Sequence, residues 1–230
     1  MDLGYPPFEM RDEKGAPAGV SADLAKALGA KLGRPVEIEN IPFAGLIPAL
    51  KTNRLDLVIS SMTATPERAQ SIDFSEPYLQ TGLCLLVNAK SNIQSIADLD
   101  RPGKSVAVVR GTTGHIYAVK NIHNARLLVL EQPPACVLEV AQGKTEAFIF
   151  DQMSVLQFSL KNPETTRALL TPFQTETWAV GLRKGNDALR AQVNAFIKEF
   201  REQGGFDKLG DHWLSEQKAA FQKLGVPFVF

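Results

Sequence analysis

Apolar residues recur at helical spacing near the start of the chain and then alternate with polar ones. Between Gly19 and Gly33 leucines fall one helical turn apart, which predicts a first helix with a single apolar stripe. The segment PVEIENI (35–41) alternates, which is typical of a strand. The segment AGLIPALKTN (44–53) is expected to be a short helix with Pro48 near its first turn, because a deeper proline breaks the hydrogen-bond ladder.

The rest of the chain alternates between strand and helix patterns. After LDLVIS (55–60), a buried strand, the predicted elements are strand SVAVV (105–109), helix HIYAVKN (115–121), strand RLLVL (126–130), helix CVLEVAQG (136–143), strand EAFIF (146–150) and helix DQMSVLQFSLKN (151–162). Successive βαβ units predict sheets that are largely parallel, with helices on their faces. WAVGLRKGND (178–187) returns as a strand, and residues 189–200 repeat as a long amphipathic helix before terminal helices.

Two such α/β blocks in 230 residues predict two lobes of roughly 100 residues each. The strand-like segments LLVNAKS (85–91) and WAVGLRK (178–184) are the expected crossings between them. Lobe 1 is therefore predicted to hold both ends of the chain, as residues 1–88 and 182–230. Lobe 2, residues 89–181, is inserted.

The charge balance gives no reason to expect a nucleic-acid partner. Lys and Arg total 25, and Asp and Glu total 25, so no net field draws the chain to a polyanion. The longest apolar runs fall well short of the roughly 20 residues that span a bilayer. The partner is expected to be small or locally recognised.

The cysteines and histidines do not form a metal-binding pattern. Cys84 and Cys136 lie in apolar segments far apart, which favours two separately buried thiols over a single bridge. The three histidines are scattered and have no carboxylates at ligand spacing. We expect neither a metal site nor a cofactor.

The first and last residues of the sequence lead to two further expectations. MDLGYPPF reads as though it begins partway through a strand, which suggests a trimmed mature form without its signal peptide. The final GVPFVF reads as a packed terminus, which favours a free-standing protein over a domain cut from a receptor.

The stretch SSMTATPERA (60–69) suggests an anion site at the end of a strand. Thr65 is a suitable N-cap and Pro66 a suitable first helical residue. Helix N-termini attract anions, and Arg68 could hold a carboxylate with its fork of donors. The same residues also fit a plain capped surface helix whose arginine points into water.

Two further features shift the balance toward a ligand site. A second anion-friendly turn, GTTG (111–114), also follows a strand and precedes a helix. Asp151 directly follows the strand EAFIF; it suits an N-cap, and it could equally accept an ammonium group. An anion site with a cation acceptor describes an α-amino acid zwitterion.

The order and spacing of several motifs resemble one family. They are YPPF (5–8), GVSADL (19–24), FAGLIPAL (43–50), LDLVISSMTATPERAQSIDFSEPY (55–78), VAVVRGTTG (106–114) and FIFDQM (148–153). The chain resembles the extracytoplasmic solute-binding proteins, family 3, which bind polar amino acids for ABC importers. The resemblance covers essentially the whole chain and implies an α/β, two-lobed periplasmic-binding-protein-like fold of type II, with lobes joined by two hinge strands.

The resemblance also implies roles for single residues. Arg68 would hold the ligand α-carboxylate, assisted by Thr63 and Thr113. Ser61 and Asp151 would receive the α-ammonium group.

Further contacts are implied around the ligand side chain. Tyr5 and Phe43 would wall the pocket, and Asp2 lies where the family can contact a head group. Gly111, which opens the GTTG turn, is counted with the ligand-binding residues.

Two departures from the family pattern bear on specificity. Ser21 stands where many relatives carry an acidic residue, which weakens the case for lysine or arginine as ligand because a buried cation needs a partner. Gly114, where some relatives carry a larger polar residue, would leave room or flexibility. We expect a neutral polar amino acid such as glutamine.

The expected function is ligand binding with hinge closure and delivery to an ABC permease, by a periplasmic or extracytoplasmic monomer that is not an enzyme. One alternative is a cyclohexadienyl dehydratase-like enzyme. That group resembles this chain but uses a glutamate as its acid one helical turn after the aspartate matching Asp151, where this chain has Ser154. A ligand-sensing domain of a receptor is a second alternative.

Overall fold

The chain forms two compact units in the computed structural model, which describes residues 1–226. Unit 1 comprises Met1–Gln80 and Thr177–Phe230, and unit 2 is Thr81–Glu176. The prediction that the final residues pack as a terminus concerns residues 227–230, which lie outside the described residues.

The chain crosses between the units twice, within β5 (Leu79–Asn88) and within β9 (Thr166–Trp178). Strand β9 is longer than any strand that the sequence pattern predicts in this region, where only its last residue was expected to be extended. Its interior carries Pro172, which cannot donate to a ladder. The strand tolerates this proline because it lies at the end of its sheet.

Unit 1 contains short strands and most of the long helices. Its elements are β1 (Met10–Arg11), β2 (Pro17–Ala18), α1 (Val20–Leu32), α2 (Phe43–Lys51), β3 (Leu57–Val58), α3 (Pro66–Ala69), β4 (Ile72–Phe74), β10 (Gly181–Arg183), α7 (Asp187–Glu202), α8 (Gly205–Trp213) and α9 (Ser215–Lys223). The predicted helix between Gly19 and Gly33 is confirmed, and Gly33 ends it in the left-handed conformation that favours glycine.

In the three-stranded sheet of unit 1 neighbouring strands pair antiparallel, not parallel as expected. Its order is β3-β10-β4, and β10 pairs antiparallel with both neighbours. The two strands that α3 connects thus run the same way, as a βαβ unit requires, but a strand from beyond unit 2 lies between them. An apolar cluster that includes Leu46, Leu50 and Ile72 packs α2 against this sheet.

Two local expectations in unit 1 are wrong. Residues 35–41 form no strand. Near their end, Met1 donates to the Glu39 carbonyl and accepts the Ile41 N–H, and two hydrogen bonds are too few to make a strand ladder. Pro48 lies inside α2, not in its first turn. The helix tolerates it because Pro48 and Ala44, whose carbonyl loses its donor, are both exposed and water can replace the bond.

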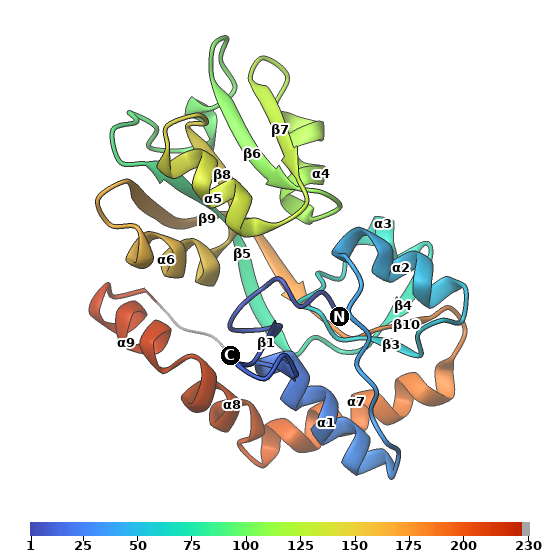
Figure 1. Ribbon diagram of the computed structural model, residues 1–230. Coiled ribbons are helices and arrows are strands. Elements are labelled where there is room, and N and C mark those ends of the chain that lie inside the picture. The colour runs from blue at the N-terminus through green and yellow to red at the C-terminus, as the bar shows by residue number, and fades with distance from the viewer. Residues whose placement is uncertain (227–230) are drawn as a thin grey trace. The chain divides into compact units, whose positions relative to one another are not determined.

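Unit 2 is built around one mixed sheet with the order β7-β6-β8-β5-β9 (Figure 1). Its other elements are η1 (Ile96–Asp98), β6 (Ser105–Val109), α4 (Thr113–Asn121), β7 (Arg126–Leu130), α5 (Pro133–Ala141), β8 (Ala147–Asp151) and α6 (Gln152–Lys161). Strand β6 runs parallel to β7 and β8, as the βαβ pattern predicts, whereas β5 runs antiparallel to β8.

The two faces of this sheet bury alternate residues of each strand. Val106 and Val108 face a cluster that α4 covers, whereas Ala107 and Val109 face α5 and α6. The same period of two runs through β5 and β8, so every central strand is covered on both faces. Cys84 and Cys136 both lie in the second cluster as buried free thiols, which confirms the two-thiol interpretation.

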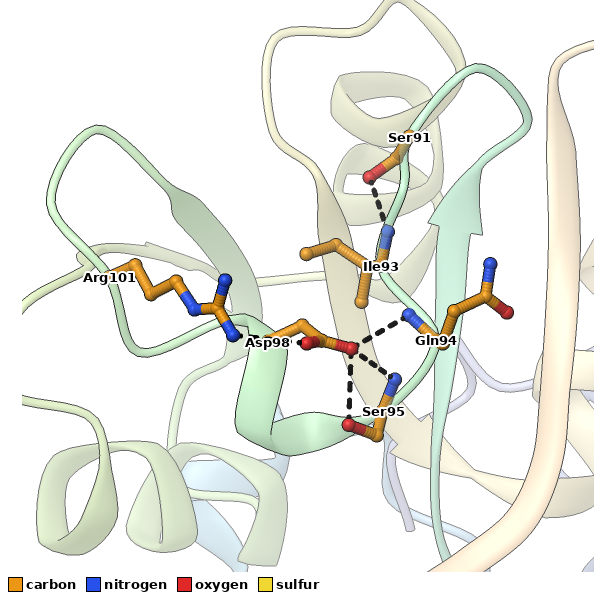
Figure 2. Close-up of polar contacts among 6 residues, drawn as sticks. All are labelled: Ser91, Ile93, Gln94, Ser95, Asp98 and Arg101. Atoms are coloured by element: carbon orange, nitrogen blue, oxygen red, sulfur yellow. Dashed lines mark hydrogen bonds and ion pairs between the residues drawn. The ribbon is translucent and has the colours of Figure 1, made fainter.

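A capping box orders the start of η1, the short helix between β5 and β6 in unit 2 (Figure 2). Asp98 Oδ2 accepts the backbone N–H groups of Gln94 and Ser95, each at 3.0 Å, and the Ser95 hydroxyl at 3.1 Å. Arg101 donates to its other oxygen. These donors, led by the Gln94 N–H, hold the pKa of Asp98 below its ordinary value.

Among the described residues no helix is long and apolar enough to cross a membrane.

Candidate functional site

Arg68 is buried in unit 1, with 7% of its surface exposed. Thr65 caps α3 by accepting the Arg68 N–H at 3.2 Å, and Pro66 is the first helical residue, as predicted. The guanidinium group donates from Nη1 to the Thr63 carbonyl at 2.8 Å and lies 5.3 Å from the centre of the Phe43 ring. The alternative of a surface arginine pointing into water is therefore excluded.

The segment that carries Thr63 is tied to the second half of unit 1. Thr63 forms an antiparallel bridge with Trp178, Ala64 donates to the Thr177 carbonyl, and Ala179 donates to Met62. Because these bonds flank Thr63 on both sides, the carbonyl that holds Arg68 has a fixed direction.

Asp2 and Phe43 are linked to each other. Asp2 Oδ2 accepts the Phe43 N–H at 2.8 Å, which caps the start of α2, and Oδ1 accepts the Gly4 N–H at 3.1 Å. The Asp2 N–H in turn donates to Ser60 Oγ at 3.0 Å. The Asp2 carboxylate thus orders the backbone around Phe43, whatever it contributes to a ligand.

Tyr5 belongs to an aromatic cluster in unit 1. Its ring stacks on Phe8 at 5.3 Å, and Trp178 meets Phe8 edge-on at 5.0 Å. The backbone of Tyr5 pairs with Glu9 in an isolated bridge. The YPPF turn therefore brings Glu9 back toward Tyr5.

Glu9 is a buried residue that the sequence analysis did not single out. Its Oε1 accepts the Ser61 hydroxyl at 2.9 Å and the Ser21 hydroxyl through a short bond. Burial raises the pKa of Glu9 to about 8, and the two serine hydroxyls oppose that shift. Ser61 has a left-handed backbone (φ 48°), which is uncommon for a residue other than glycine and typical of functional sites.

Gly19 brings Ser21 to Glu9. Its backbone (φ 108°, ψ 177°) is open essentially to glycine alone, and a Cβ there would lie 2.5 Å from the Phe8 carbonyl oxygen. This close approach lets Val20 and Ser21 donate to the carbonyls of Pro7 and Phe8, at 3.2 and 2.9 Å.

We expect Gly19→Ala to lower the free energy of unfolding by at least about 2 kcal/mol, because strain and the clash with Phe8 add. Gly15→Ala is the matched control: Gly15 also has a positive φ, of 81°, but a Cβ there would meet nothing within 4 Å. It should cost only about 1 kcal/mol. Urea unfolding measures both, and equal losses would contradict this account of Gly19.

In unit 2, Thr113 is held by a second buried acid that the sequence analysis missed. Its hydroxyl donates to Glu176 Oε2 at 2.9 Å, and Gln174 donates to Glu176 Oε1 at 2.8 Å. The N-cap of α4 is Thr112, whose Oγ1 accepts the His115 N–H. The threonines on either side of Glu176 favour a strand, but no apolar alternation marks it and nothing local signals its partner.

Asp151 ends β8 and caps α6. It is 6% exposed and accepts the Ser154 N–H at 3.0 Å, so the capping role is confirmed. The GTTG turn follows β6, which runs parallel to β8, so both lie at the carboxyl edge of the same strands. Open α/β sheets commonly bind ligands at this edge.

Two glycines of the GTTG turn behave differently. Gly111 (φ 76°) turns the chain and donates its N–H to His115 Nδ1 at 3.2 Å. A Cβ on Gly114 would lie 2.8 Å from the Ile149 carbonyl oxygen. The expectation that Gly114 leaves room is wrong, because the helix start packs directly on β8.

The sequence and fold match one family of known proteins. The family model for bacterial extracellular solute-binding proteins, family 3, matches residues 1–216. The chain belongs to this family. A probable histidine-binding protein from Neisseria gonorrhoeae is a 31% identical solute-binding relative; the alignment covers 93% of this chain and 81% of that protein.

Solved structures of this kind share the fold. AncCDT-1, an ancestral amino acid-binding protein and precursor of cyclohexadienyl dehydratase, is 35% identical, with a TM-score of 0.85 over 92% of each chain. An ancestral arginine-binding protein bound to glutamine is 32% identical, with a TM-score of 0.85 over 93% of this chain and 95% of that one. The predicted two-lobed α/β fold is confirmed.

Proposed function

We propose that this solute-binding protein binds one free α-amino acid at a time outside the cytoplasm and delivers it to the permease of an ABC importer. The observation that carries this proposal is the burial of Arg68 on Thr63 and Phe43, since a buried guanidinium group at the end of a strand suits a carboxylate. Family membership supports the transport role.

The proposed binding site uses residues from both units. Arg68 and Thr63 hold the α-carboxylate, with Thr113 at the start of α4. Asp151 and Ser61 receive the α-ammonium group. Binding draws the units together by bending β5 and β9, and the permease recognises the closed form.

Tyr5 and Phe43 form the apolar wall of the site, with Asp2 and Gly111 beside it. Phe43 suits this role because its ring is only partly buried and is held from one side by Arg68. Tyr5 is less exposed than Phe43, because its ring is stacked on Phe8.

The ligand that we propose is a neutral polar amino acid, such as glutamine. Position 21 is a serine whose hydroxyl donates to Glu9, and Glu9 is largely protonated at neutral pH because its pKa is raised to about 8. This corner of unit 1 therefore lacks the full negative charge that a lysine or arginine side chain needs. We propose that the protein acts as a monomer.

A thermal-shift screen tests the function. Each of the twenty common L-amino acids is added at a concentration about 100 times a micromolar dissociation constant, which should stabilise the folded protein by about 2.7 kcal/mol. For a chain of this size we expect the melting temperature to rise by about 5 to 10 °C with the true ligand. No shift with any of them would contradict the proposal, and a response to arginine but not glutamine would contradict the specificity.

A dehydratase is the second candidate, because AncCDT-1 is a precursor of such an enzyme. Against it, the position one helical turn after Asp151 is Ser154, which has no carboxyl group to act as general acid and whose N–H donates to Asp151. We therefore expect no turnover of prephenate or arogenate. Product formation above the buffer rate would establish the enzyme.

A further inference from the structure

A buried carboxyl group lies directly behind the Ser61 hydroxyl. Glu9 is fully buried, and its Oε1 accepts the hydroxyl protons of Ser21 and Ser61, the latter at 2.9 Å. Glu9 Oε2 is buried and has no hydrogen-bond partner within the described part of the chain. Ser61 is only partly buried, so it is the member of this group that can also face a ligand.

The bond to Glu9 determines what Ser61 can offer. A serine hydroxyl has one proton to donate and two lone pairs that accept. Because the Ser61 proton points at Glu9, the oxygen is left as an acceptor toward anything on its other side. An acceptor suits an ammonium group and does not suit a carboxylate.

We propose that Glu9 is a positioning residue of the amino-acid site, which fixes the Ser61 hydroxyl as an acceptor for the ligand α-ammonium group. This inference rests on the proposed function and adds to it a residue that does not touch the ligand. The left-handed backbone of Ser61 agrees with it, since the hydroxyl bond helps to hold an otherwise unfavourable conformation (φ 48°).

The charge on Glu9 gives the inference a pH dependence. The groups that face its carboxyl are the hydroxyls of Ser21 on α1, Ser61 after β3 and Tyr78 before β5, together with the Met1 amino group and the Asp2 carboxylate. Because Oε1 accepts two hydrogen bonds, the proton of the neutral carboxyl lies on Oε2. A bound ammonium group beside Ser61 favours the ionised form, so ligand binding should release this proton.

The experiment compares three variants by calorimetry, with L-glutamine, L-arginine and L-histidine as probes together with any other amino acid that stabilises the protein. Glu9→Leu leaves Ser61 without its acceptor, so affinity should fall about 10- to 100-fold. Glu9→Gln retains an acceptor oxygen but cannot ionise, so it should bind within about threefold of the wild type at pH 6. Glu13→Leu, which replaces an exposed glutamate in the same way, should leave affinity within about twofold.

The pH series separates positioning from simple packing. From pH 6 to 8.5 the affinity of the wild type should rise about five- to tenfold relative to Glu9→Gln, as expected if the ligand lowers the pKa of Glu9 by about one unit. The wild type should also release about 0.4 proton per bound ligand at pH 8, seen as a binding enthalpy that varies with the buffer, whereas Glu9→Gln should not.

Three results would overturn the inference: wild-type affinity in Glu9→Leu, an equal loss in Glu13→Leu, or identical pH profiles for the wild type and Glu9→Gln. If Glu9→Leu does not fold, the pH series of the wild type and Glu9→Gln still decides it. If no probe binds the wild type, the proposed function itself fails, and the inference falls with it.

Discussion

Replacing Arg68 with alanine is expected to lower amino-acid affinity, measured by calorimetry, by at least about 30-fold. Removing one member of a buried charge pair typically costs roughly 2 to 5 kcal/mol, and each 1.4 kcal/mol is a tenfold change. Arg68→Lys keeps the charge but loses the planar fork, so an intermediate loss is expected.

Arg201 provides a matched control within unit 1. Its guanidinium group lies 5.4 Å from the centre of the Phe206 ring and donates to the Pro77 carbonyl at 2.9 Å, the same two kinds of contact that Arg68 makes. Arg201→Ala should therefore leave affinity unchanged. Full binding by a folded Arg68→Ala protein would remove Arg68 from the site.

Glu9 should make the protein less stable as the pH rises. In the unfolded chain its carboxyl ionises near its ordinary pKa of 4.5, whereas in the folded protein burial raises that pKa to about 8. Between these values the folded protein keeps a proton that the unfolded chain has lost, so each increase in pH favours unfolding. The effect is absent below about pH 4.5 and levels off above pH 8.

Glu9→Gln should abolish this dependence. From pH 5 to pH 8 the free energy of unfolding of the wild type should fall by roughly 3 to 4 kcal/mol relative to Glu9→Gln, measured by urea unfolding without ligand. Glu13→Gln, which removes an exposed carboxyl group, should follow the wild type. Parallel curves for the wild type and Glu9→Gln would show that Glu9 is ionised in the folded protein.

The sequence pattern predicted unit 2 more completely than unit 1 for a physical reason. The central strands of unit 2 are covered on both faces, so they appear as short apolar runs such as SVAVV, and helices with clear stripes separate them. In unit 1 the strands have two or three residues, and the middle strand of the sheet, β10, follows unit 2 in the sequence. No local pattern predicts such a distant pairing.

The sequence likewise predicted some residues of the candidate site and missed others. Thr65, Pro66 and Asp151 were found because capping is a local property that a few residues determine. Glu9 was missed because its partners, Ser21 and Ser61, lie 12 and 52 residues away along the chain. A glutamate after YPPF looks like any exposed charge until the fold buries it.

The place of β10 in unit 1 has a consequence for synthesis of the chain. Unit 2 is one continuous stretch, so all of its strands are available once the ribosome has passed Trp178. The sheet of unit 1 lacks its middle strand until Arg183 has been made, although β3 and β4 were finished about a hundred residues earlier. The inserted unit can therefore fold first, and the half of the protein that carries Arg68 stays incomplete until most of the chain exists.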